Sequence, residues 1–386
     1  MRPRRLRTRG AVAALAGTLL ALSAGQTAVA ARATATDPAP RTAATATVSA
    51  AQDQAARAIA RSLTDSTWRA RVQRAALTSD EVPVTALAAR EAGPLKATLA
   101  AADRRITAAK GLDATAGSLL RLRLGADAMR AALRSGTTPW VAAATSDDDT
   151  RTLVAYDSRG RSHTLDAHDT PARPVYVVDI DGSAALAAGL DVLSDRLNRY
   201  GLRSTAPDAQ PRAGHAAGAR TAGGGFWTSR ITAVELSDDE EPWAKGDAEI
   251  YTLVTGFGLD GAVRVDPVDM PYLDNDGTVY RPNQILVNWS NYKYDLADAV
   301  MMEEDGSTNY RDLAKAIATA LLTITDQGTY IPLVNAVLDA IPDDWWTDDP
   351  DFVDSWYTLA RSDTGTRYGA RGNGWMTVEP YFVQEL

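Results

Sequence analysis

Acidic residues in the C-terminal part of this chain gather in short clusters that separate runs of strand-forming residues. The clusters span residues 237–241, 246–247, 274–277, 303–306 and 348–351. The runs between them are apolar and β-branched, which predicts strands that carry several acidic loops to one end of a sheet. Carboxylates about 5 Å apart repel by roughly 3 kcal/mol at an effective dielectric of 20, so converging loops favour a bound cation. Calcium takes about six to eight oxygen ligands, and we therefore expect a calcium site.

The formal net charge of −9 conceals two chemically different halves. Residues 226–386 hold 29 Asp and Glu against 10 Lys and Arg, a net of −19, whereas the other 225 residues hold 20 against 30, a net of +10. An acidic half repels phosphates, which argues against nucleic acid as a partner. The chain has no cysteine, so its stability must come from core burial, from a bound metal or from both.

The first thirty residues have the pattern of a secretory signal peptide. Five arginines precede an apolar run at residues 11–22, and residues 28–30 are small enough for cleavage. We expect residues 1–30 to be removed, residues 31–50 to form a disordered leader, and the mature protein to be secreted. The Arg4 and Arg5 pair leaves twin-arginine export open. No later stretch has the roughly 20 apolar residues of a transmembrane helix.

The basic half is predicted to be a helical bundle with a small sheet, over residues 51–203. Apolar residues recur there at spacings of three, four and seven, which indicates amphipathic helices, and the pattern continues through residues 119–133. Short strand-like runs follow at residues 140–144, 152–156, 162–166 and 175–180, and then one more helix at residues 183–200. Residues 204–225 contain almost no large apolar side chain and are predicted to be a flexible linker.

The acidic half, residues 226–386, is predicted to be an antiparallel β-sandwich, which makes the whole chain α+β. Its strand-like runs are residues 231–236, 248–254, 262–265, 284–289, 299–302, 353–359 and 375–378. Helical periodicity interrupts them at residues 309–341, between two acidic clusters. If the sandwich continues beneath this inserted helical hairpin, the clusters at its two ends come back together.

Two acidic stretches resemble the calcium loops of C2 domains. Residues 238–254 are similar to the first loop and the strand after it, and residues 303–305 with 349–353 are similar to the third loop. The pattern departs from C2 domains where Glu303 replaces the usual Asp, and in the helical insertion. The resemblance implies a C2-like sandwich that binds calcium through Asp238, Asp247, Glu303, Asp305 and Asp351.

From about residue 50 to the end, the chain is similar to an uncharacterised family of secreted bacterial proteins, domain of unknown function 3103. The similarity rests on residues 174–180, 270–277, 282–285, 306–310 and 351–359. It implies export and no established activity.

An apolar run that ends in Asp-x-Asp-Gly, residues 175–182, resembles the first motif of haloacid-dehalogenase-type phosphatases. By that resemblance Asp179 would be the nucleophile and Asp181 the acid and base, with magnesium bridging them to a phosphate. The downstream Ser or Thr and Lys of those enzymes have no evident counterpart here. A strand end followed by a helix N-terminus with favourable acidic residues explains the same motif. Whether the protein is an enzyme therefore stays open.

Two further motifs have simple structural explanations beside the functional ones. His163 and His168 could contribute to a zinc site, but a polar turn between strands explains them as well. Residues 274–277 begin like an EF-hand loop, yet position twelve of that loop is Ile285, where a bidentate Glu should stand. The spacing favours a tight hairpin turn, with Asp274 and Asp276 as supplementary ligands at most.

Seven of the nine tryptophans lie in residues 226–386, and Trp345 and Trp346 directly precede an acidic cluster. Exposed tryptophan could stack on sugar rings or enter a membrane interface, whereas buried tryptophan would fill the sandwich. The leading hypothesis is a secreted calcium-binding protein whose partner is an extracellular polysaccharide, a cell-wall component or a lipid surface. The alternative is a metal-dependent phosphoesterase that uses Asp179 and Asp181, and a structural exoprotein without a further ligand is a third possibility.

Overall fold

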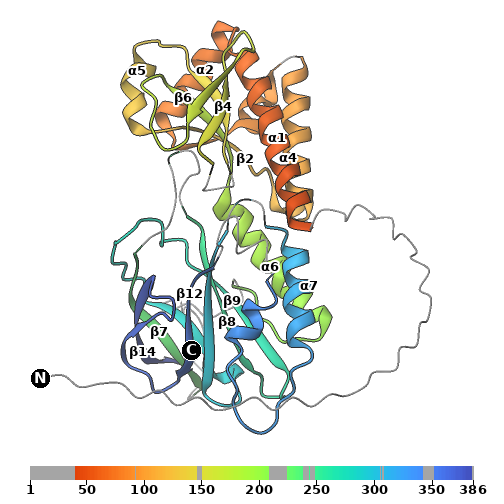
Figure 1. The fold of residues 1–386 in the computed structure, drawn as a ribbon, viewed down its shortest axis with the longest axis vertical. Helices are drawn as coiled ribbons and strands as arrows, with labels where there is room; N and C mark the ends of the chain where they lie inside the picture. The colour runs from red at the N-terminus through yellow and green to blue at the C-terminus, as the bar shows by residue number, and fades with distance from the viewer. Residues whose placement is uncertain are drawn as a thin grey trace, which may run out of the picture. The chain divides into compact units, whose positions relative to one another are not determined.

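Helices and a mixed sheet come first along the chain, and two antiparallel sheets follow (Figure 1). The computed structural model describes residues 40–91, 93–145, 150–207, 224–237, 243, 248–304, 306, 308–341 and 352–384. These residues belong to one compact unit, Pro38–Leu386. The α+β class predicted from the sequence is confirmed.

The first sheet has six strands in the order β1-β2-β6-β3-β4-β5 and only one parallel pair, β3 with β6. The strands are β1 (Glu81–Pro83), β2 (Leu120–Leu124), β3 (Trp140–Ala143), β4 (Thr152–Tyr156), β5 (Ser162–Asp166) and β6 (Val175–Ile180). The helices around it are α1 (Pro40–Ser62), α2 (Ser66–Thr78), α3 (Val84–Leu87), α4 (Pro94–Ala109), α5 (Arg130–Arg134) and α6 (Gly182–Tyr200). The helix predicted at residues 183–200 is thus present as α6.

The helix predicted across residues 119–133 is wrong at its start, where β2 lies. Leu-Arg-Leu-Arg-Leu alternates with a period of two, and the central Leu122 is buried opposite Val178 of β6. Three leucines at short spacings fit a helical face almost as well, so the alternation of arginine was the better signal. Only the short α5 and a 3₁₀ turn, Asp127–Met129, take up the rest of the pattern.

Two four-stranded antiparallel sheets follow, in the orders β10-β7-β14-β13 and β12-β11-β8-β9. Their strands are β7 (Gly225–Leu236), β8 (Ile250–Phe257), β9 (Val263–Asp269), β10 (Gln284–Asn288), β11 (Leu296–Glu303), β12 (Phe352–Ala360), β13 (Gly365–Tyr368) and β14 (Gly374–Gln384). Both sheets contribute to one apolar core, with Ile231 and Val378 from the first and Val254 and Met301 from the second. All seven predicted strand runs fall on these strands, and only β13 was not predicted.

The predicted helical insertion is present between β11 and β12. It contains α7 (Tyr310–Leu321) and the short α8 (Val334–Leu338). Asn309 caps α7 by accepting hydrogen bonds from the backbone N–H groups of Arg311 and Asp312. Strands β11 and β12 pair directly across the insertion, so the sheet is continuous beneath it.

A second apolar cluster joins the predicted segments 51–203 and 226–386. It includes Ile59 of α1, Tyr176 of β6, Leu190 of α6, Leu253 of β8 and Ile317 of α7. Helix α6 packs against α7 and β9, as Figure 1 shows for α6 and α7. The two segments therefore share a core, and most of the predicted linker, residues 208–223, lies outside the described residues.

Candidate functional site

The strands that border the predicted calcium loops have their ends side by side. Glu303, the last residue of β11, is paired in register with Ile250, the first residue of β8. On the other side of β11, Met302 is paired with Phe352, the first residue of β12. Beyond the strands, the backbone N–H of Glu304 donates to the carbonyl of Glu249 at 3.0 Å. One end of this sheet thus collects the borders of three acidic stretches.

Of the five predicted calcium ligands, only Glu303 belongs to the part that the structure describes. Its side chain is buried at the end of β11. Asp238, Asp247, Asp305 and Asp351 lie outside the described residues. Within the described ranges, no group of three or more His, Asp or Glu is arranged to hold a metal ion. The calcium site stays a prediction.

The Asp-x-Asp-Gly motif lies at the end of β6 and the start of α6, and both carboxylates are paired with arginines of β2. Asp179 forms an ion pair with Arg123 (Nε to Oδ2, 2.8 Å), and Asp181 forms one with Arg121. Asp181 also caps α6, because its Oδ1 accepts the backbone N–H of Ala184 at 2.9 Å. The strand-end explanation of the motif therefore fits the geometry of both carboxylates.

The glycine of the motif is explained by a contact with the acidic end of the sandwich. A Cβ atom on Gly182 would lie 2.1 Å from the carboxyl carbon of Glu249, so a side chain at this position would require the Glu249 carboxylate to move. Glu249 precedes β8, far from the motif in sequence. The contact brings the strand end with Asp179 and Asp181 next to the strand ends with Glu249 and Glu303.

Five carboxylates meet around this contact, and we call them the acidic junction: Glu81, Asp179, Asp181, Glu249 and Glu304. Desolvation, followed by the charges of Glu304, Asp179 and Glu81, raises the pKa of Glu249 well above its ordinary value. Partial burial and the charges of Asp181 and Asp179 raise the pKa of Glu81 to about 7. The junction thus holds two glutamates whose protonated forms are favoured, and for Glu81 this preference extends to about pH 7.

Glu304 has a different role, because it is the anion of a fully buried ion pair. Lys110, just beyond α4, and Glu304 are both inaccessible to solvent, with 2.5 Å between Nζ and Oε1. The hydroxyl of the equally buried Tyr310 donates to Glu304 Oε2, and the carbonyl of Lys110 accepts the backbone N–H of Tyr310. Gly189 of α6 makes room for the ring of Tyr310. This contact connects α4 with β11 and α7.

A family model described as "Protein of unknown function (DUF3103)" matches residues 51–386 of the chain. The chain belongs to the DUF3103 family. The match covers every residue of the acidic junction and confirms the family predicted from the sequence. A comparison of this DUF3103 protein with curated proteins and one with solved structures each returned no match. Within the described ranges, its helices are all too short or too polar to cross a bilayer.

The two simpler motifs fit their structural explanations only in part. His163 lies on β5 rather than in the predicted turn and stacks on Trp140 with 4.0 Å between ring centroids, whereas the backbone N–H of His168 donates to Asp166 in a turn. The segment with Asp274 joins strands of two different sheets, so it is not the predicted hairpin turn. Asp274 accepts a hydrogen bond of 2.6 Å from the hydroxyl of Tyr280, in the segment between β9 and β10.

Sequence reasoning missed Glu81, Lys110, Glu249 and Glu304 as members of a cluster. Glu249 and Glu304 lie within the acidic stretches, but nothing local to them indicates a contact with β6 or α4. Only the alternation in β2 offered a usable signal, because it places Arg121 and Arg123 on one face of a strand.

Glu249 and Glu304 are joined by a backbone hydrogen bond, and the same substitution of Glu by Gln should have opposite effects on stability at the two positions. The folded state raises the pKa of both Glu249 and Glu81, so their protonation contributes stability that is fully present below the ordinary pKa of 4.5. This contribution is lost as the pH rises through the pKa of the folded state, which is about 7 for Glu81. In chelator, Glu249→Gln should therefore raise the Tm relative to wild type at pH 7.5 and leave it nearly unchanged at pH 4. Glu304→Gln should lower the free energy of unfolding at pH 7.5 by about 3 kcal/mol or more, because Lys110 loses its buried counter-charge.

Thermal unfolding of both variants from pH 4 to pH 8 measures these differences. A lower Tm of Glu249→Gln at pH 7.5 would show that Glu249 is a paired carboxylate and would contradict this account of the junction.

Proposed function

We propose that this protein is a secreted calcium-binding protein that acts as an extracellular binding module. The observation that carries the proposal is the pairing of β11 with both β8 and β12 at Glu303 and Met302. This register puts the borders of the predicted acidic loops at one end of one sheet. Acidic loops that start from neighbouring strand ends are the arrangement that a multidentate oxygen site needs.

Covalent connection restricts where the other predicted ligands can lie. In sequence, Asp351 directly precedes β12 and Asp305 follows β11 by two residues. Asp247 is three residues before β8 of the same sheet, whereas Asp238 is two residues beyond β7, which belongs to the other sheet. Carboxylate oxygens are the ligands that calcium prefers, and together with Glu303 these residues would hold the ion.

The acidic junction gives a second reason to expect a cation. Glu249 and Glu304 are next to one another, and desolvation with like charges favours the neutral form of Glu249. A divalent ion near this end of the sheet would reduce the repulsion and favour the ionised carboxylate. At a calcium concentration of about 100 times Kd, binding would add roughly 2.7 kcal/mol to the stability of this cysteine-free chain.

Aromatic side chains support the binding part of the proposal. Trp345 and Trp346 lie outside the described residues, but Tyr368 on β13 is 77% exposed and Trp227 on β7 is 40% exposed. Tyrosine and tryptophan at a surface offer an apolar face and a polar group to a partner. A polysaccharide, a cell-wall component or a lipid surface would contact both the apolar face and the polar group of such a side chain.

Calcium is expected to raise the Tm of the wild-type protein, and chelator to lower it, because the ion binds the folded state alone. Glu303→Gln should reduce the calcium-dependent increase, whereas Asp274→Asn, a matched control in the segment between β9 and β10, should preserve it. Differential scanning calorimetry with calcium and with chelator measures these shifts. An identical Tm of the wild-type protein in both conditions would rule out the calcium proposal.

The second candidate is a metal-dependent phosphoesterase, and the observation that favours it is the proximity of Glu81 and Glu249 to Asp179 and Asp181. Glu81, with its pKa of about 7, is suited to proton transfer near neutral pH. Against it, Asp179 is already paired with Arg123, and β6 is the last strand of its sheet along the described chain.

An aryl phosphate assayed with magnesium decides between the two candidates. The phosphoesterase candidate requires turnover that Asp179→Asn abolishes. Equal turnover by the wild type and by Asp179→Asn would eliminate Asp179 as the nucleophile.

A further inference from the structure

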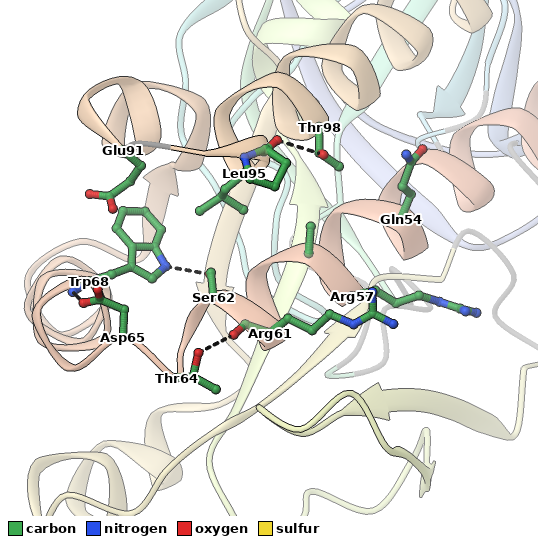
Figure 2. Close-up of a pocket in the computed structure, with 12 residues that line it drawn as sticks. Gln54, Arg57, Arg61, Ser62, Thr64, Asp65, Trp68, Glu91, Leu95 and Thr98 are labelled. Carbon is green, nitrogen blue, oxygen red and sulfur yellow. Dashed lines mark hydrogen bonds between the residues drawn. The ribbon is translucent and has the colours of Figure 1, made fainter.

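A pocket of about 640 Å³ opens between the second half of α1, the start of α2 and the segment that leads into α4 (Figure 2). Its size is within the range of pockets that hold small molecules. It belongs to the basic half of the chain and shares no residue with the acidic junction. Figure 2 shows Arg57 and Arg61 extending on one side, with Asp65, Trp68 and Glu91 on the other.

Most polar groups that line the pocket already have partners within the protein. The indole N–H of Trp68 donates to Ser62 Oγ at 2.8 Å, and the hydroxyl of Thr98 donates to the carbonyl of Pro94 at 3.0 Å. The hydroxyl of Thr64 donates to the carbonyl of Arg61 at 2.9 Å. These donors are therefore engaged before any ligand enters.

The two carboxylates of the pocket are engaged as well. Asp65 caps α2 by accepting the backbone N–H groups of Thr67 and Trp68 at 2.8 and 2.9 Å. Glu91 forms an ion pair with Arg71. Asp65 is thus occupied by backbone N–H groups, and the charge of Glu91 is balanced by an arginine.

The two arginines are held in place by the neighbouring sheet. Arg57 forms an ion pair with Asp53 (Nε to Oδ2, 2.9 Å), and its guanidinium lies 4.8 Å from the centre of the Tyr156 ring. Arg61 is one helical turn further along α1 and lies against Gly160, where a Cβ atom would be 3.1 Å from its Nε. Gly160 has a φ of +78° in the β4–β5 turn, so the turn itself requires glycine and leaves room for Arg61.

Arg61 has no carboxylate within 4 Å among the described residues. The charges of Arg57 and Glu91 are balanced by Asp53 and Arg71, and Asp65 is occupied by the N-terminus of α2, so Arg61 is the cation of the pocket that is available to an anionic ligand. Its apolar floor includes Ala58, Pro94 and Leu95. A phosphate would bring a second negative charge close to Asp65 and Glu91, so a carboxylate fits the charges better.

We propose that this pocket binds the carboxylate of a small apolar molecule, such as the C-terminal end of a peptide, through Arg61. The carboxylate accepts hydrogen bonds from the guanidinium, and the apolar body covers Ala58 and Leu95. Charge-assisted pairs of this kind are the stronger class of hydrogen bond, and arginine suits carboxylates because its N–H groups form a planar fork. The proposal does not depend on calcium binding.

N-acetyl-leucine and its neutral analogue N-acetyl-leucinamide are matched probes for the proposal. In chelator, titration followed by NMR of the mature protein should show binding of N-acetyl-leucine at α1 and at least about tenfold weaker binding of the amide. Arg61→Gln should weaken binding of N-acetyl-leucine by a similar factor. Arg74→Gln, an exposed arginine on α2 outside the pocket, should leave it unchanged.

Ala58→Leu keeps all charges and fills the floor, so it should also abolish binding while the Tm stays near that of the wild type. Equal binding of the amide and the acid would overturn the role of Arg61. Inorganic phosphate that binds as well as N-acetyl-leucine would overturn the role of the apolar floor. Unchanged binding by Ala58→Leu would place the ligand elsewhere and contradict the proposal, as would the absence of any binding of N-acetyl-leucine.

Discussion

The buried ion pair between Lys110 and Glu304 is the contact on which the arrangement of this protein depends. Both side chains are inaccessible to solvent, and the hydroxyl of Tyr310 and the backbone N–H of Gly306 also donate hydrogen bonds to the carboxylate. Removing one member of such a pair leaves an uncompensated charge in the interior, at a cost of roughly 3–5 kcal/mol. Arrangements that separate the end of α4 from the end of β11 are therefore disfavoured, and the shared apolar core includes residues of both elements. Apolar burial supplies most of the stabilisation.

The same contact accounts for the concentration of carboxylates at one place. Next to this contact, Glu249, directly before β8, lies against Gly182 at the start of α6. Asp179 and Asp181 are neutralised there by Arg123 and Arg121, but Glu249 has no arginine partner of this kind among the described residues. The acidic end of the sheet thus combines compensated and uncompensated carboxylates. The uncompensated carboxylate of Glu249 is the feature of this fold that would favour a cation near the proposed calcium site.

Local patterns in the sequence predicted the elements much better than the contacts between them. Alternation and turn residues located the sandwich strands, and helical periodicity located α7, because those signals act over a few residues. The leucines of the Leu120–Leu124 run fit a helical spacing as well as a strand, and only its alternating arginines distinguish β2. Asp179 and Asp181 were recognised as a motif, yet their arginine partners and Glu249 come from segments distant in sequence. No local pattern specifies such a contact, because burial and charge pairing decide it only after the chain has folded.

We propose that the end of the sheet at Glu303 binds calcium, which would make this DUF3103 protein a calcium-dependent binding module. Because carboxylate oxygens bind lanthanides as they bind calcium, an anomalous difference map from crystals grown with terbium in place of calcium tests this site. We expect a strong peak beside Glu303, between the ends of β8, β11 and β12, that is absent from crystals of Glu303→Gln. A map without a peak at this end of the sheet, or with peaks only elsewhere, would refute calcium binding there.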